Sequence, residues 1–251
     1  MTRNVEPMSS GGQEPDSNPV IPSRRRGISP VSSASISPPA RPSYWLRARR
    51  ELASADPVMA RIIAGYPRNA LRSRGDTFST LARSIVGQQI SVKAADSVWN
   101  RVVGARGVIS PHAVLRRRAT TLRACGLSDR KVEYMRDLAA HFADGRVSAG
   151  ALAAMDDEQA IACLTEIRGI GRWTAEMFLI FTLLRPNVLP LDDLGLLKAI
   201  GVHYLDGTPP AELLRGAGRA RAERVAAPWA PWRSVATWYL WRSLDPVPVQ
   251  Y

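Results

Sequence analysis

Apolar residues recur three and four positions apart along most of the chain after Tyr44. Trp45, Ala48 and Leu52 follow this spacing, as residues on one face of a helix do. Proline and glycine separate the periodic segments, and no convincing pair of alternating strands interrupts them. We therefore expect an all-α protein, with helices over about 42–54, 57–65, 78–86, 92–102, 111–117, 119–125, 129–143, 149–153 and 157–167.

The first 42 residues have a different composition from the rest. They are rich in Ser, Pro and Gly and contain almost no aromatic residues, so they cannot bury enough apolar surface to offset the cost of ordering. The sequence predicts a disordered tail over 1–42 and a helical core over 43–251. No apolar run approaches the roughly 20 residues that cross a bilayer, so we expect a soluble protein with no membrane partner.

One segment, 164–175, is suited to holding a phosphate backbone; it reads Leu-Thr-Glu-Ile-Arg-Gly-Ile-Gly-Arg-Trp-Thr-Ala. A helical pattern stops at Gly169, a new one starts near Arg172, and the turn between them has little side-chain bulk. The N-terminus of the second helix would face the same anion. The tight turn could also expose the backbone carbonyls of Thr165, Ile167 and Ile170 to a monovalent cation. The alternative is an ordinary connection with a glycine cap, which a lone Gly-x-Gly would favour.

Two adjacent carboxylates follow, at Asp192 and Asp193. Acids directly before an apolar helical run are favourable as N-caps, which is the simplest interpretation of both. Capping and chemistry are compatible, because one acid can cap the helix while its neighbour faces a cleft.

Four motifs in one order resemble the helix-hairpin-helix DNA glycosylases, and within them the 3-methyladenine DNA glycosylase II branch. They span 85–91 (IVGQQIS), 164–175 (the hairpin), 189–196 (LPLDDLGL) and 232–242 (WRSVATWYLWR). The resemblance covers about 45–245 and implies two helical lobes around a cleft that holds the hairpin and the aspartate. It assigns Asp193 as the catalytic carboxylate, with Asp192 as the runner-up.

The same resemblance addresses the outcome of the reaction and the base pocket. Relatives that also cut the strand carry a lysine where Trp173 stands, and a tryptophan cannot form a Schiff base. We therefore expect a monofunctional enzyme that leaves an abasic site. Electron-rich rings attract cationic alkylated purines, so the candidates for stacking are Trp173, Tyr239, Trp238 and Trp241, with Trp229 and Trp232 less favoured. Trp238 and Trp241 could equally belong to the core stripe of the last helix.

An enzyme of this kind must extrude its base and fill the gap. The position where the family inserts a wedge side chain matches Gln89, whereas Gln88 is better explained as a residue that holds the loop. Lys131, after the helix cap Ser128, is only a speculative phosphate contact, and Lys198 is best explained as a surface or phosphate-contacting lysine. The expected DNA-binding residues are Gln89, Gln88, Gly169, Gly171, Arg172 and Thr174.

The composition agrees with a polyanionic partner. The formal net charge is +12, and basic surfaces gain from releasing the counterions of DNA, although RNA or a membrane surface would also fit. The two cysteines, Cys125 and Cys163, cannot build an iron–sulfur site, and three scattered histidines give no zinc spacing. We expect no cofactor other than the monovalent cation, and double-stranded DNA with damaged bases as the partner of a monomer. The expected location is the cytoplasm of a bacterium, or the nucleus or an organelle in a eukaryote.

Three functions remain open at this point. The first is a base-excision-repair glycosylase for alkylated purines such as 3-methyladenine and 7-methylguanine. The second is a glycosylase for another damaged base, and the third is a DNA-binding module without catalysis. A carboxylate beside the hairpin weighs against the third, because binding alone does not require it.

Overall fold

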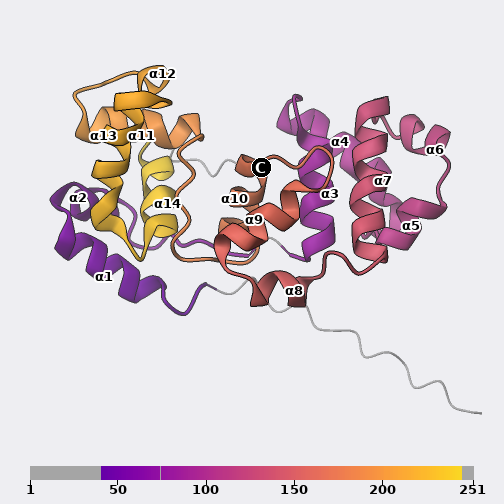
Figure 1. Ribbon diagram of the computed structural model, residues 1–251, viewed down its shortest axis with the longest axis horizontal. Coiled ribbons are helices and arrows are strands. Elements are labelled where there is room, and N and C mark those ends of the chain that lie inside the picture. The colour runs from indigo at the N-terminus through magenta and orange to yellow at the C-terminus, as the bar shows by residue number, and fades with distance from the viewer. Residues whose placement is uncertain (1–40, 74, 245–251) are drawn as a thin grey trace, which may run out of the picture. The chain divides into compact units, whose positions relative to one another are not determined.

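A computed structural model describes residues 41–73 and 75–244 (Figure 1). Every regular element in this part of the chain is helical, so the all-α prediction is confirmed. The predicted tail, 1–42, lies almost wholly outside the described residues. Among the helices described, none is both long enough and apolar enough to cross a membrane.

The helices follow one another with short connections. Their bounds are α1 Trp45–Ala55, α2 Pro57–Gly65, α3 Thr77–Gly87, α4 Val92–Val103, α5 Pro111–Arg116, α6 Ala119–Ala124, α7 Asp129–Ala143, α8 Ala149–Ala154, α9 Asp157–Thr165, α10 Arg172–Phe181, α11 Leu194–Tyr204, α12 Pro210–Leu213, α13 Gly216–Ala226 and α14 Arg233–Leu244. Two short 3₁₀ turns, η1 (Gly104–Arg106) and η2 (Ala227–Trp229), complete the described elements.

Side-chain caps explain where several of these helices begin. Asp56 accepts hydrogen bonds from the first backbone N–H groups of α2, and Asp76 and Ser91 do the same for α3 and α4. Asp156 and Gln159 form a reciprocal capping box at the start of α9. Each cap satisfies donors that a helix start leaves without partners, so the polar residues in the connections determine the element boundaries.

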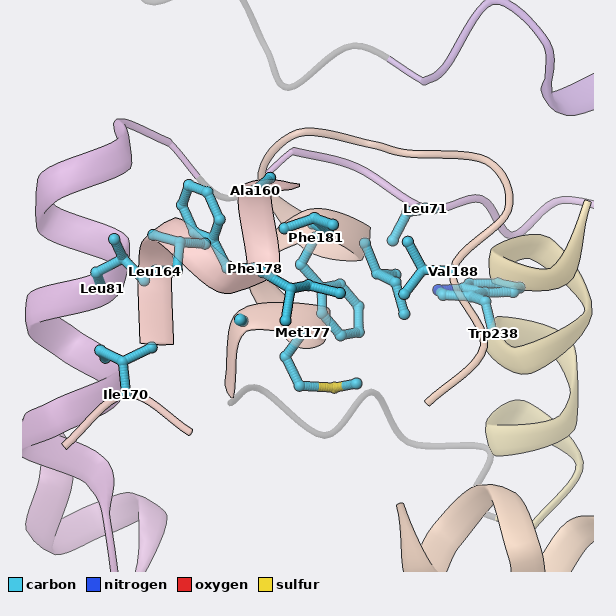
Figure 2. Packing of buried hydrophobic residues seen from close by; sticks show 14 of the residues in the cluster. Leu71, Leu81, Ala160, Leu164, Ile170, Met177, Phe178, Phe181, Val188 and Trp238 are labelled. Carbon is cyan, nitrogen blue, oxygen red and sulfur yellow. The ribbon is translucent and has the colours of Figure 1, made fainter. Parts of the chain in front are cut away.

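The helices form two groups joined through α9 and α10. In the first group α1, α2 and α14 pack together, and α11 contacts α12, α13 and α14; in the second, α3 contacts α4 and α7, and α7 contacts α5 and α6. Helix α10 packs on α9 and α3 (Figure 1). Buried side chains run continuously through these contacts; Figure 2 shows Leu81 of α3, Leu164 of α9, Phe178 of α10 and Trp238 of α14 in one cluster. The hairpin helix thus lies where the two groups meet.

Candidate active site

The turn between α9 and α10 combines exposed positions, Arg168 and Gly171, with a buried anchor. Ile167 and Ile170 are 1% and 4% exposed, and the N–H of Ile170 donates to the carbonyl of Ile167 at 3.0 Å. Gly169 has a φ of +83°, a conformation that favours glycine. Gly171 is the N-cap of α10 and supplies no side-chain hydrogen bond. The first N–H groups of α10 therefore have no side-chain cap, and the turn has the geometry of an anion site.

Asp193 is the carboxylate that the fold brings to this hairpin. It is 8% exposed and is the N-cap of α11, where its Oδ1 accepts from the N–H of Leu196 at 2.6 Å. The indole Nε1 of Trp241 donates to the same oxygen at 2.8 Å, and the Nε1 of Trp173 donates to Oδ2 at 2.9 Å. Helices α10, α11 and α14 thus hold one carboxylate through three N–H donors. Asp193 therefore both caps α11 and lies next to the hairpin helix.

The neighbouring acid has a different environment. Asp192 is exposed and its Oδ1 accepts from Arg219 of α13 at 2.7 Å. The structure thus separates the two candidates: Asp193 lies among the tryptophans, whereas Asp192 forms a surface ion pair.

A third aromatic residue, Phe181, packs on one of the two tryptophans that donate to Asp193. The ring of Trp241 stacks on Phe181 of α10, with centroids 5.6 Å apart and planes at 14°. Gly195 makes room for this arrangement, because a Cβ at that position would lie 3.1 Å from Asp193 Oδ1 and 3.3 Å from Trp241 Cδ1. Trp173 is 36% exposed, the highest value among the tryptophans described. It therefore presents a ring surface beside a fixed carboxylate.

Two of the predicted pocket residues belong to the core instead. Tyr239 is 0% exposed and stacks on Trp45, and Trp238 is 5% exposed and packs edge-on against the same ring. Trp229 and Trp232 are also buried, where their indoles donate to Asp56 and Glu51. The structure corrects the expectation that Trp238 and Tyr239 line a base pocket, since neither ring reaches a surface on which a base could stack.

A cavity of about 990 Å³ lies between α3, α4 and α10. Gln89, Trp173, Thr174 and Phe181 are among the residues that line it. This volume is at the upper end of the range for small-ligand pockets. The predicted wedge residue and the exposed tryptophan thus border one cavity, and the Trp173 indole connects that cavity to Asp193.

Gln88 and Gln89 have different places in the loop after α3. The Nε2 of Gln88 donates to the carbonyl of Gly169 at 2.7 Å, so Gln88 holds the loop against the hairpin. Gln89 is exposed and has a φ of +58°, an uncommon conformation for a residue other than glycine. Lys131 is a loop-holding residue in this structure, because its ammonium donates to the carbonyls of Val86 and Gln88, both at 2.7 Å.

Arg172 is engaged by two acids. Its guanidinium donates to both carboxylate oxygens of Glu158, at 2.9 and 2.5 Å, and to Glu176 Oε1 at 3.0 Å. A phosphate at Arg172 would have to compete with Glu158.

Glu176 is 4% exposed, and burial raises its pKa to about 7 although Arg172 opposes the shift. The sequence analysis did not single out Glu176, although a lone acid within an apolar helix could have indicated a buried carboxylate.

The hairpin carbonyls fit a monovalent cation only in part. The carbonyl of Ile167 already accepts the N–H of Ile170 and keeps one lone pair for another partner. Within the described residues, no group of three or more His, Cys, Asp and Glu could hold a metal ion. The cation at Thr165, Ile167 and Ile170 therefore stays a prediction.

Comparisons with known proteins agree with this geometry. The family model described as "HhH-GPD superfamily base excision DNA repair protein" matches residues 82–220. DNA-3-methyladenine glycosylase 1 of Schizosaccharomyces pombe is 31% identical, over 74% of this chain and 80% of that protein. Putative DNA-3-methyladenine glycosylase YfjP of Bacillus subtilis is 33% identical, over 67% of this chain and 59% of that protein.

Solved structures give the same result at the level of the fold. The DNA-3-methyladenine glycosidase of Bacillus halodurans has a TM-score of 0.64 and 33% identity, over 76% of this chain and 90% of that one. The S. pombe 3-methyladenine DNA glycosylase, solved in complex with abasic DNA, has a TM-score of 0.62 and 29% identity, over 78% and 96% of the two chains. With the family match over more than half of its length, this chain belongs to the HhH-GPD superfamily of base excision DNA repair proteins.

Proposed function

We propose that this protein is a monofunctional DNA glycosylase that removes alkylated purines of the 3-methyladenine and 7-methylguanine class from duplex DNA. The observation that carries the proposal is the Asp193 carboxylate, buried and held by the indoles of Trp173 and Trp241 while Trp173 also lines a large cavity. The names of the relatives support the same substrate class.

The proposed reaction breaks the bond between the sugar C1′ and the base nitrogen. The electron pair of that bond goes to the base, positive charge develops at the sugar, and a nearby carboxylate stabilises that charge. Water then adds to C1′ and loses its proton, and Asp193 orients it or accepts that proton. An alkylated purine already carries positive charge, so it leaves as a neutral base without needing a general acid. The abasic site is the other product.

Trp173 determines two further features of the proposed reaction. Its exposed ring beside the carboxylate is suited to stacking on a cationic base. Because it carries no amine, it cannot attack C1′ to form a Schiff base, so the DNA strand is left intact. Trp241 stacks on Phe181, and Phe181 lines the same cavity as Trp173.

The hairpin and the loop after α3 would hold the DNA. The glycine turn, in which Gly171 is exposed and Gly169 half-buried, and the N-terminus of α10 suit a phosphate of the duplex, without reading its sequence. A monovalent cation at the hairpin carbonyls would support that contact. Gln89, which lines the same cavity as Trp173, would fill the gap left by the extruded base. The protein would act as a monomer on double-stranded DNA, in the cytoplasm of a bacterium or in the nucleus or an organelle of a eukaryote.

The test is base release from a duplex that carries one 3-methyladenine analogue or one 7-methylguanine, followed by alkali to reveal abasic sites. We expect release by the wild type and at least about a 100-fold slower rate for Asp193→Asn, because that variant cannot neutralise the developing charge. Asp192→Asn is the matched control and should lose less than about threefold, since exposed ion pairs contribute little.

Other outcomes would redirect the proposal. Strand cleavage without alkali would contradict the monofunctional assignment. Release of an oxidised or deaminated base alone would favour another lesion class. Binding without release of any base, unchanged in Asp193→Asn, would leave a DNA-binding module.

A further inference from the structure

One face of α7 contacts both loops that the proposed function assigns to DNA. Lys131, Tyr134 and Asp137 are spaced three residues apart on this helix, so their side chains leave it on neighbouring rows. Each of the three reaches a different point on the loop after α3 or on the hairpin turn.

Lys131 holds the end of α3. Its ammonium donates to the carbonyls of Val86 and Gln88, both at 2.7 Å. These carbonyls belong to the C-terminal end of α3, where partial negative charge gathers and a cation is favourable. The residue that follows, Gln89, is exposed with a φ of +58°. Such a conformation is costly for a residue with a Cβ and persists only where the surroundings hold it.

Tyr134 and Asp137 hold the hairpin turn. The ring of Tyr134 lies against Gly169 so closely that a Cβ there would be 2.3 Å from its Cδ2. The Oδ2 of Asp137 accepts from the N–H of Arg168 at 2.8 Å. The two loops are joined directly as well, because Gln88 Nε2 donates to the carbonyl of Gly169 at 2.7 Å. Helix α7 is thus a common support for two loops that lie some eighty residues apart along the chain.

We infer that Lys131 is a positioning residue for base extrusion, which holds Gln89 in its left-handed conformation and fixes it relative to the hairpin. The inference rests on the proposed function, in which Gln89 fills the gap left by the extruded base. Lys131 does not contact the base or the sugar. It acts through the carbonyl of Gln88, directly before the wedge residue, and its loss should slow the opening of the duplex instead of the breaking of the glycosidic bond.

The experiment compares base release from two substrates with one lesion. In the first, 7-methylguanine is paired within a duplex, and in the second the same base lies in an unpaired bubble, where extrusion costs little. For Lys131→Met we expect release from the duplex to fall about tenfold and release from the bubble to stay within about twofold of the wild type. The control is Arg61→Met, which removes one cation from an exposed position of α2 and should change neither rate by more than about twofold. Equal losses on both substrates, or no loss on the duplex, would overturn the inference.

A second measurement does not depend on activity. Gly tolerates a positive φ, so Gln89→Gly should relieve the strain that Lys131 holds in place. Lys131→Met should therefore lower Tm more in the Gln89→Gly background than in the wild type, where loss of the lysine also releases the strain at Gln89. Equal decreases in Tm in the two backgrounds would overturn the inference. If the wild type releases no alkylated base from either substrate, the proposed function fails, while this thermal comparison still tests the support of Gln89.

Discussion

The Asp193 carboxylate and the two loops proposed to hold DNA are held in opposite ways. Side chains of α10 and α14, together with one backbone N–H, converge on the carboxylate of Asp193 and bury it. The loops after α3 and α9 keep exposed residues such as Gln89 and Gly171, and α7 holds both loops, mainly through their backbone groups. Chemistry at a sugar requires one functional group fixed in a dry site, whereas gripping DNA requires an outer surface free of protein contacts. The difference predicts distinct consequences for substitutions in the two regions.

The largest effect on stability is expected in the hairpin. Gly169→Ala would bring a Cβ to 2.3 Å from the Tyr134 ring at a φ of +83°, so we expect a loss of roughly 3 kcal/mol in the free energy of unfolding. Gly171→Ala is the matched control, because a Cβ there has no heavy atom within 4 Å and its φ is −91°. Urea denaturation of both variants makes the comparison. Similar values for the two would mean that α7 does not define the shape of the turn.

Glu176 links the two regions, since it lies one turn after Trp173 and accepts from Arg172 at the start of α10. Burial raises its pKa to about 7, above the value of the unfolded chain. The neutral form is therefore favoured in the folded protein, and its contribution to stability, present below about pH 4.5, is lost as the pH rises through about 7.

Glu176→Gln keeps the neutral form at every pH. Relative to this variant, the wild type should lose about 2 kcal/mol of stability between pH 5 and pH 8. Unfolding in urea at the two pH values measures the difference. A constant difference between the proteins would show that Glu176 stays charged throughout that range.

The smallest expected effect separates the Asp193 site from the core along α14. Trp241→Phe keeps an aromatic ring against Phe181 but removes one donor to Asp193, and we expect base release to slow about tenfold. Tyr239→Phe changes a residue with 0% exposure and should leave the rate within about twofold. Single-turnover base release measures both. A loss in Tyr239→Phe as large as in Trp241→Phe would contradict the core assignment of Tyr239.

Helix positions were predictable because they depend on local pattern. The expected helix over 129–143 coincides with α7, and 57–65 coincides with α2. The first helix begins at Trp45, three residues later than expected, and α9 ends at Thr165, two residues earlier. The chain leaves the helix at the hairpin before its apolar spacing stops, because Ile167 is buried as an anchor of the turn.

The aromatic residues of α14 were not predictable to the same degree. Every residue from Ser234 to Leu240 is buried, so this helix has no polar face that would orient its pattern. Trp238 and Tyr239 pack on Trp45, whereas Trp241 donates to Asp193. The periodicity of the sequence could not distinguish these two roles. Similarly, the sequence suggested at most a phosphate contact for Lys131. Its hydrogen bonds go to backbone carbonyls more than forty residues away in the chain, so no pattern near Lys131 could predict them.

The sequence by itself determined the helical class, the hairpin with its positive φ at Gly169, and a tryptophan in place of an amine nucleophile. These properties depend on residues close together in the chain and on the chemistry of single side chains. Only the tertiary structure decided that Asp193 and not Asp192 meets the two indoles, that Tyr239 is core, and that α7 supports both loops. These outcomes depend on contacts between segments far apart in sequence. Among side chains of the same chemistry, packing and burial decide which one reaches the site and which one lies in the core or on the surface.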